Sequence, residues 1–388
     1  MKWPTESLDS VATLDRRSIH PSDAEPATPY VGLEHLNGDG AINCTQTVDS
    51  AGLKSNKFHF SDRHVLYGKL RPYLRKISRP AFSGVCSTDI IPILPKEGVS
   101  RDFLFHFLRT PGTVDLATSR SSGANLPRLS PKQLASFRVP LPPLDEQKRI
   151  ACILDAVDAL RVKRRDSLAQ LDALPQSVFL DMLGDPVTNP HGWDVRELRK
   201  TKSRVQIGPF GSLLHKEDYV VGGVPVVNPM HIVGGLIRPG REQTVSEQKA
   251  EDLGNYRLRS GDVVMGRRGE MGRCAVVTDS EAGMLCGTGS LFFRPHPDEL
   301  SPLFLAQTLS SESMKRALAS LSQGVTMPNL NRTMVEGLKV ALPPLDLQRR
   351  FVAIVESIGR QSASQRAHLV ELDNLFASLQ SRAFRGDL

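Results

Sequence analysis

The chain has 388 residues, of which 40% are hydrophobic and 23% are charged, and its net charge is +7. These values are typical of a globular chain of two or three domains, and they exclude a collagen-like protein or a long disordered tract. The mild positive charge is compatible with a polyanionic partner without indicating one by itself. The N-terminal segment MKWPTESLDS lacks the apolar core of a signal peptide, and no run approaches the ~18 apolar residues of a membrane span.

Cysteine usage indicates a reducing compartment. Five cysteines occur, an odd number, and no CxxC pair is present, so a disulfide scaffold or a zinc ribbon is not expected. We therefore expect a cytoplasmic protein in which each cysteine is a small buried apolar residue. The residues are Cys44, Cys86, Cys152, Cys274 and Cys286.

In chain order, the sequence predicts two variable bodies, each followed by a long helix. Residues 1–140, the first body, hold short β-branched runs broken by glycine and proline, and a helical stretch at Arg101–Leu108. Residues 141–186 have helical periodicity. Residues 187–341, the second body, again have short strands, such as Val224–Val227, and residues 342–388 are again helical. Each body is expected to be a compact α+β domain.

The helical parts belong to an internal repeat. VPLPPLDEQKRI at 139–150 corresponds to VALPPLDLQRRF at 340–351, an offset of 201 positions, and twelve of the thirty residues from 121 to 150 are identical at that offset. A weaker match pairs Cys86 with Cys286. Because repeats are the signature of duplicated structural units, the two halves are expected to share one architecture.

Each predicted helix has a coiled-coil pattern with recognisable ends. Apolar residues recur at spacings of three and four, and the predicted seam includes Leu174 and Leu375. Asp145 and Asp346 are predicted N-caps, and Gly184 and Gly386 are predicted C-caps. Pro175 lies inside the first helix alone, where a kink is expected. If the two helices pack together, the quasi-symmetry of the repeat makes them antiparallel.

Several segments together resemble the specificity subunits of Type I restriction–modification systems. They are LPPLDEQKRI and LPPLDLQRRF, IGPFGSLL at 207–214, GDVVMGRRGEMG at 261–272, and the terminal LFASLQSRAFRGDL. In the first body the counterpart of GDVVMGRRGEMG is DRHVLYGKLRPYLRK at 62–76, which lacks the two glycines after the basic pair.

The resemblance implies two target recognition domains of mixed α/β structure, joined by an antiparallel coiled-coil spacer. It further implies double-stranded DNA, two modification (methyltransferase) subunits and restriction (translocase and nuclease) subunits as partners, and no membrane. The chain would select an asymmetric bipartite site for adenine methylation or cleavage, in the cytoplasm of a prokaryote. S-adenosylmethionine, ATP and Mg²⁺ would be used by the partners and not bound by this chain.

A search for catalytic motifs supports a non-catalytic protein. The sequence contains no NPPY-type methyltransferase motif, no Walker A loop and no HExxH motif. Asp145, Glu146 and Lys148 could suggest a nuclease cluster, but the second copy carries Leu347 in place of Glu146. No catalytic residue and no metal site are therefore predicted.

The candidate DNA contacts are basic and polar residues in the bodies, because phosphates are bound by Lys and Arg and bases by side chains with matching donors and acceptors. Those chosen are Lys69, Arg71, Arg75, Lys76, Arg128, His215, Lys216, Arg267, Arg268, Arg273, Thr326 and Asn329. The apolar residues Phe179, Met182, Phe376 and Phe384 are predicted to form an exposed docking patch for a partner subunit. Two alternatives stay open: a module derived from a fused restriction–methyltransferase, and a repeat adaptor that binds only protein.

Overall fold

The structure is a computed structural model that describes residues 3–43, 46–321 and 329–388. The chain forms two compact units: Met1–Asp166 with Arg366–Leu388, and Ser167–Gln365. Each unit holds one body and parts of both long helices, α5 (Leu144–Leu183) and α10 (Leu345–Arg385). Because the boundary cuts both helices, a unit is built from segments far apart in the sequence.

The first unit contains two small four-stranded sheets. The larger one is antiparallel and has the order β2 (Ala12–Leu14), β9 (Ile90–Pro95), β6 (Val65–Gly68), β7 (Ile77–Ser78). The smaller one has the order β3 (Ser18–Ile19), β5 (Lys57–Phe60), β8 (Gly84–Cys86), β4 (Tyr30–Val31), with β4 and β8 parallel. A further antiparallel pair joins β1 (Thr5–Ser7) to β10 (Arg138–Pro140).

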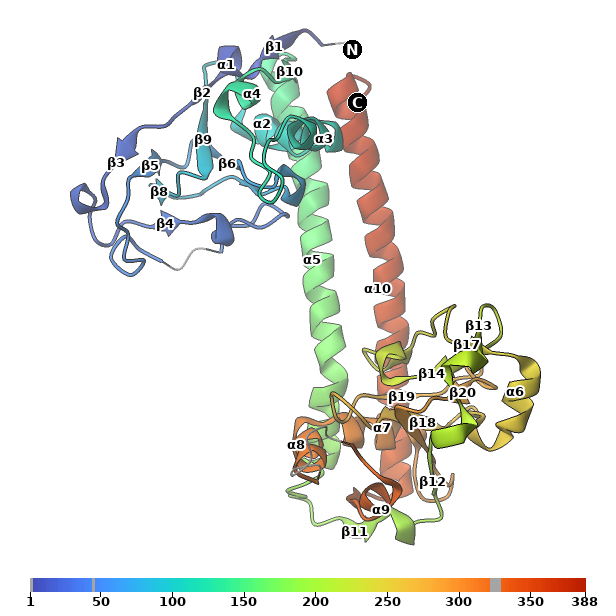
Figure 1. Ribbon diagram of the computed structural model, residues 1–388. Coiled ribbons are helices and arrows are strands. Elements are labelled where there is room, and N and C mark those ends of the chain that lie inside the picture. The colour runs from blue at the N-terminus through green and yellow to red at the C-terminus, as the bar shows by residue number, and fades with distance from the viewer. Residues whose placement is uncertain (1–2, 44–45, 322–328) are drawn as a thin grey trace. The chain divides into compact units, whose positions relative to one another are not determined.

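Short helices also belong to the first unit, and among them α2 lies beside the larger sheet (Figure 1). They are α1 (Leu8–Val11), α2 (Arg101–Leu108), α3 (Pro111–Ser119) and α4 (Pro131–Ala135). Ser100, Thr110 and Ser130 begin α2, α3 and α4 by accepting a hydrogen bond from a backbone N–H of the first turn. The apolar face of α2 packs with strand residues and with both long helices in one core that includes Phe103, Leu154 and Ala383.

The second unit repeats this plan. Its larger antiparallel sheet has the order β12 (Arg204–Ile207), β21 (Ser290–Arg294), β18 (Val263–Gly266), β19 (Cys274–Val276), and β11 (Asp194–Glu197) pairs with β22 (Lys339–Leu342). A smaller sheet has the order β13 (Tyr219–Val220), β17 (Thr244–Val245), β14 (Val224–Val227), β20 (Leu285–Cys286). β15 (Ile232–Val233) and β16 (Leu236–Ile237) form a hairpin. The helices are α6 (Glu247–Asp252), α7 (Pro302–Ser310), α8 (Glu312–Leu321) and α9 (Arg332–Glu336).

Strand order confirms the repeat and locates where the copies differ. The larger sheets match strand for strand, and each smaller sheet contains one parallel pair, β4–β8 or β14–β20. In the first unit the additional strand β5 pairs with β8, whereas in the second β17 pairs with β14. The predicted α+β class, with each body followed by a long helix, is therefore confirmed, while the smaller sheets diverge.

The glutamine of the repeated PPLD segment ties each body to its long helix. Gln147 is buried, accepts a hydrogen bond from the Ser100 N–H at 2.8 Å and donates to the carbonyls of Gly98 and Pro142. Gln348 makes the equivalent bonds to the Ser301 N–H and the Glu299 and Pro343 carbonyls. Since buried polar groups need partners, this clamp gives a structural reason for the shared motif.

The ends of α5 and α10 pack together within the first unit. Arg149 donates to the Leu388 carbonyl, and Arg161 Nε lies 2.6 Å from Asp373 Oδ1. Residue numbers therefore increase along α5 in the direction in which they decrease along α10. The helices are therefore antiparallel there, as predicted. In the second unit the Phe179 and Phe351 rings, one from each helix, lie 5.5 Å apart.

Several details of the helix prediction need correction. Asp145 and Asp346 lie in the first turn and are not N-caps, because each helix begins one residue earlier. There they still complement the helix dipole. Leu174 and Leu375 are exposed, because the buried stripe passes instead through neighbouring residues such as Phe179. Gly184 and Gly386 follow the helices with φ of 77° and 87°, as C-cap glycines do, and α5 continues through Pro175.

Candidate nucleic-acid interface

The basic segment of the first body is a closed loop that follows β6. The Gly68 N–H donates to the Lys76 carbonyl, and the Leu129 N–H donates to the Lys69 carbonyl, so both ends are fixed to the sheet and to the segment before α4. Lys69 Nζ donates to the Thr88 carbonyl at 2.6 Å and lies 3.4 Å from Asp89. The Lys69 ammonium group is thus bound by groups of the protein itself.

The second body has the same loop after β18. The Gly266 N–H donates to the Arg273 carbonyl, and the Leu330 N–H donates to the Arg267 carbonyl. Arg267 Nε donates to the Thr288 carbonyl at 3.0 Å, and its side chain is buried. Burial lowers the pKa of Arg267 from its ordinary value, with a smaller effect from Arg268. The Arg267 guanidinium is therefore bound inside the protein, and a contact of this residue with DNA stays a prediction.

These bonds match the two loops at both ends, although the first loop (residues 69–75) is one residue longer than the second (residues 267–272). Lys69 corresponds to Arg267 and Lys76 to Arg273, and the bridge between Leu70 and Arg128 corresponds to the bridge between Arg268 and Asn329. Lys76 Nζ donates to the Leu33 carbonyl in the 3₁₀ turn Leu33–His35, and Arg273 Nη1 donates to the Pro229 carbonyl in the equivalent turn Pro229–His231. The predicted correspondence of the two basic segments thus has a geometric basis.

The remaining loop candidates are more accessible. Arg71, Arg75 and Arg268 are exposed, and none has a side-chain hydrogen bond or ion pair within the described ranges. Arg128 is half exposed and lies 3.4 Å from Asp89. Arg273 is paired with Glu270. Thr326 lies outside the described residues.

Two other segments meet the second loop at the same end of the sheet. The Gly208 N–H donates to the Ser290 carbonyl, and a Cβ at Gly208 would collide with the Gly287 carbonyl, so this position requires glycine. The IGPFG segment therefore lies beside the residues that bind Arg267. It carries Phe210, which is 63% exposed, and the neighbouring 3₁₀ turn (Pro229–His231) carries Met230, which is 64% exposed. Sequence reasoning missed both side chains, although the glycines around Phe210 were a signal.

His215 and Lys216 belong to a different part of the second body. They lie at the 3₁₀ turn Lys216–Asp218, where the His215 N–H donates to Asp218, and Asp218 also pairs with Lys249 at 3.1 Å. Within the described ranges, no hydrogen bond or ion pair connects them to residues 267–273. Both side chains are exposed, but the structure does not bring them to the loop.

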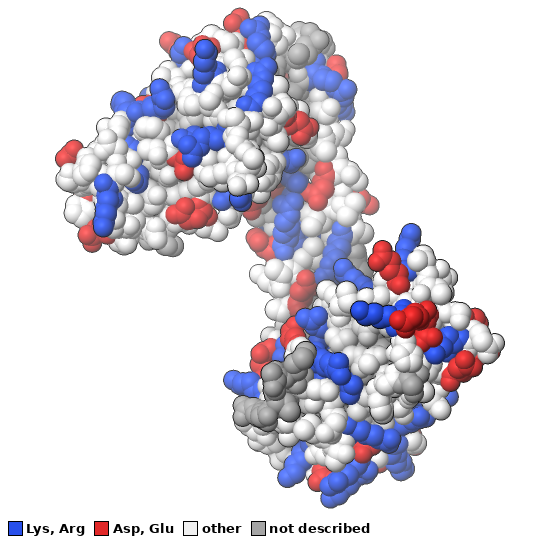
Figure 2. All heavy atoms as spheres, in the orientation of Figure 1, with Lys and Arg blue, Asp and Glu red and all other residues white. Residues whose placement is uncertain are grey.

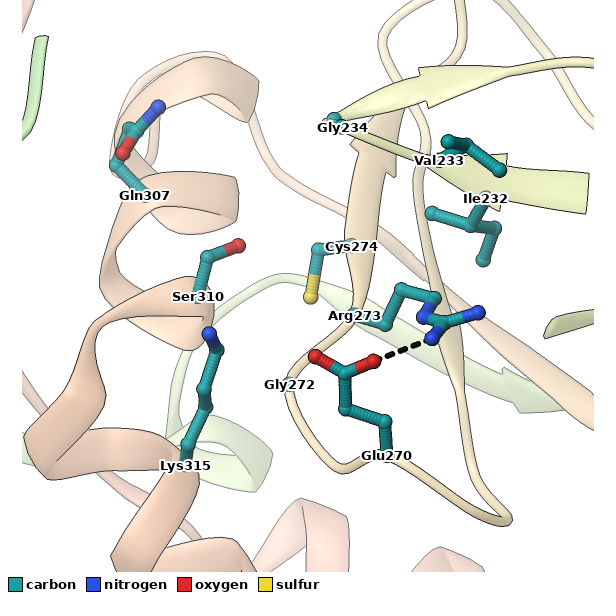
Figure 3. A pocket seen from close by; sticks show the side chains of 11 residues that line it. Ile232, Val233, Gly234, Glu270, Gly272, Arg273, Cys274, Gln307, Ser310 and Lys315 are labelled. Carbon is teal, nitrogen blue, oxygen red and sulfur yellow. Dashed lines mark hydrogen bonds and ion pairs between the residues drawn. The ribbon is translucent and has the colours of Figure 1, made fainter. Parts of the chain in front are cut away.

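A cavity of about 400 Å³ lies behind the second loop. Figure 3 shows the Glu270 carboxylate beside the Arg273 guanidinium, with Lys315 across the cavity on α8. Gly272 lies between them with φ of 75°, and a Cβ there would meet the Leu309 carbonyl at 2.7 Å. The loop is therefore held tightly on this side.

Charge alone does not mark one binding face. On the side of each unit drawn in Figure 2, Lys and Arg are interspersed with Asp and Glu. The candidate interface therefore rests on the equivalence of the two loops and on which of their side chains are free.

The cysteine prediction holds for three residues. Cys86, Cys274 and Cys286 are buried, and burial raises the pKa of Cys274 to about 12. A thiol with so high a pKa stays protonated near neutral pH and is a poor nucleophile. Cys152 is exposed on α5, contrary to expectation, and Cys44 lies outside the described residues.

The predicted docking patch is wrong in its premise of exposure. Phe179 is buried between Phe304 and Phe351, because α5 turns this side chain into the core of the second unit. Met182 is partly buried against the same core. Phe376 lies under the Arg161 guanidinium, and Phe384 packs on Phe103 and Phe107. These residues hold each unit together.

Metal binding and membrane insertion find no support in residues 3–43, 46–321 and 329–388. No group of three or more His, Cys, Asp or Glu side chains there is placed to hold a metal ion. None of the helices in those ranges is long and apolar enough to cross a membrane.

Comparison with solved structures supports the fold. A chain from work on complex assembly and conformational transition of the type I R-M system aligns with a TM-score of 0.64 and 21% identity, covering 100% of this chain and 98% of that one. The Type-I restriction-modification system S subunit from M. genitalium aligns with a TM-score of 0.59 and 15% identity, covering 99% and 96%.

Sequence comparison identifies the family. The EcoDI specificity subunit of Escherichia coli is 31% identical over 182 residues, which are 46% of this chain and only 40% of that subunit. The MjaVIII specificity subunit of Methanocaldococcus jannaschii is 24% identical over 328 residues, covering 79% of this chain and 74% of that subunit. The profile of the Type I restriction modification DNA specificity domain matches residues 2–171 and 205–374. The chain therefore belongs to the Type I restriction modification DNA specificity domain family and contains that domain twice.

Proposed function

We propose that this chain recognises double-stranded DNA for a Type I restriction–modification complex and has no catalytic role of its own. The observation that carries the proposal is one loop framework present twice with different free side chains. The free side chains are those of Arg71 and Arg75 in the first loop and Arg268 in the second. Base discrimination depends on the donors and acceptors offered, so equivalent loops with unlike side chains would recognise unlike sequences.

The target would accordingly be bipartite and asymmetric, with one word for each body. Two modification subunits would methylate adenine using S-adenosylmethionine, and restriction subunits would use ATP and Mg²⁺. This chain would bind none of these small molecules. The exposed side chains Tyr73 in the first body and Met230 in the second would each extend the candidate surface of their own body, Tyr73 through its hydroxyl and Met230 through apolar contact.

A methylome comparison tests this function. N6-methyladenine is mapped in the native host with the gene intact and deleted, while the partner methyltransferase is expressed in both strains. Loss of methylation from one bipartite, asymmetric motif is expected. An unchanged methylome would refute DNA selection and favour an adaptor that binds only protein.

A further inference from the structure

The two equivalent loops adopt left-handed backbone at the same two places with different residues. In the second body these places are Gly269 and Gly272, with φ of 76° and 75°. In the first body they are Arg71 and Arg75, with φ of 47° and 52°. The match follows from the bonds that equate Lys69 with Arg267 and Lys76 with Arg273. The first loop lacks the glycines yet keeps their conformation.

Arginine is a costly choice for such positions. A side chain in the left-handed region brings its Cβ close to the following carbonyl, and glycine avoids this clash. Of the three non-glycine residues with positive φ in the described chain, two are Arg71 and Arg75. Because the shorter loop of the second body has glycine at the corresponding places, arginine is not a general requirement of this loop.

The side chains of these arginines make no polar contact with the described residues of the protein. Both are exposed and lack hydrogen bonds or ion pairs, whereas Lys69 and Lys76 in the same loop bind backbone carbonyls. The 3₁₀ turn Pro72–Leu74 between them exposes Tyr73, which is 50% exposed. The loop therefore presents large side chains that do not contribute to its own folding.

Arg75 lines a cavity of about 450 Å³. The other arginines of this cavity, Arg109, Arg161 and Arg165, are paired with Asp158 or Asp373, which leaves Arg75 available to a ligand. Arg109 Nε in this cavity is buried and has no hydrogen-bond partner in the described structure. Guanidinium groups pair in bidentate fashion with the O6 and N7 acceptors of guanine, the commonest specific contact to a base.

We propose that Arg71 and Arg75 determine the specificity of the first body by contacting guanine in its half of the DNA site, and that backbone strain persists there because it places these two side chains. This inference rests on the proposed function. Non-glycine residues in such strained conformations occur preferentially at binding sites. The second body, with glycine at both places, has no equivalent pair and recognises its own half by other residues.

The test uses the full chain co-expressed with its modification subunits in a bacterial host free of other adenine methyltransferases. Methylated motifs are mapped by single-molecule sequencing for the natural chain, Arg71→Gly and Arg75→Gly. We expect each variant to lose selectivity at G·C positions in one half-site and to bind a duplex carrying the natural motif roughly 10- to 100-fold more weakly. The other half-site should stay unchanged.

Thermal stability provides the second readout, because glycine relieves the strain. The melting temperature of the purified chain should not fall, and should rise by up to about 3 °C. Arg71→Ala removes the guanidinium but keeps a Cβ, so it should weaken recognition without that rise. Arg16→Gly is the matched control, since Arg16 is exposed, has negative φ and carries the same charge.

The outcomes separate this inference from the proposed function. If the natural chain selects a motif and both glycine variants leave that motif and the affinity unchanged, the inference is wrong and the function stands. If the variants melt below Arg16→Gly, the arginines stabilise the fold and the inference is again wrong. If the natural chain selects no motif, the proposed function fails and the inference fails with it.

Discussion

The two bodies are attached to the long helices by different chemistry. Both use an aromatic contact: Phe103 packs on Phe384 at 5.1 Å in the first unit, and Phe304 stacks on Phe179 at 6.0 Å in the second. The first body adds a charged network in which Asp155 of α5 accepts hydrogen bonds from Arg79 at 2.7 Å and from His106 at 2.8 Å.

The second body lacks this network at the equivalent positions. At the repeat offset of 201, His106 and Asp155 correspond to Gln307 and Glu356, and Glu356 is exposed. The apolar frame of the junction is thus common to both copies, whereas its polar part is specific to one. Packing constrains shape at both junctions, whereas the hydrogen-bonded network depends on Asp155, whose counterpart Glu356 is exposed.

The largest predicted effect concerns the shared aromatic frame. Phe179→Ala should lower the free energy of unfolding of the second unit by about 3–5 kcal/mol, because it empties a site between Phe304 and Phe351. Denaturant unfolding of the purified chain measures this. Phe384→Ala should cost less, since Phe384 is only partly buried. Leu174→Ala, at an exposed position of the same helix as Phe179, should be close to neutral. Equal effects of Phe179→Ala and Leu174→Ala would contradict the assigned packing.

Loss of the carboxylate charge should lower stability at Asp155 of the first unit but not at Glu356, the corresponding residue of the second unit. Asp155→Asn should destabilise the first unit by about 2 kcal/mol, because Arg79 and His106 lose a charged acceptor. Glu356→Gln, the matched change in the second unit, should alter stability by less than ~0.5 kcal/mol. Denaturant midpoints of the two variants provide the comparison, and a larger loss for Glu356→Gln would reverse our account.

Acid should weaken the first unit through the same carboxylate. Burial alone would raise the pKa of Asp155, but hydrogen bonds from His106 and Arg79 outweigh burial and hold it below 3.8. In the same unit, bonds from Arg17 and His64 likewise overcome burial and lower the pKa of Asp15 to about 2. A carboxyl group whose pKa is lowered by folding stabilises the folded state at pH values above its ordinary pKa. This stabilisation is lost as the pH falls below about 4. Melting curves between pH 5 and about 2 should therefore show a smaller acid loss for Asp155→Asn than for the natural chain. Parallel curves would contradict this role for Asp155.

The smallest predicted effect concerns the loop of the second body. Gly269→Ala should cost about 1 kcal/mol, since φ is 76° although a Cβ there would meet open space. Gly254→Ala is the matched control, because that glycine is also open but has ordinary φ. Thermal melting distinguishes them, and a neutral Gly269→Ala would show that the loop relaxes without strain.

Much of the architecture followed from the sequence. The repeated PPLD segment located the start of both long helices to within two residues, and Gly184 and Gly386 marked their ends, because caps depend on local backbone geometry. The α+β class and the antiparallel packing of the helices followed from periodicity and quasi-symmetry. The smaller sheets could not be foreseen, since two-residue strands carry too little periodicity to specify their partners.

For the candidate site, the sequence determined which loops correspond, and tertiary structure decided which of their side chains are free. Arg267 and Arg268 are adjacent and chemically identical, yet one is buried against the Thr288 carbonyl and the other is exposed. Phe179 and Leu174 likewise divide between core and solvent on one helix. A residue type determines which groups a side chain can bond to, but its burial depends on segments that are distant in the chain. Only the folded molecule therefore shows that Arg267 is bonded inside the protein and that Arg268 is available to a ligand.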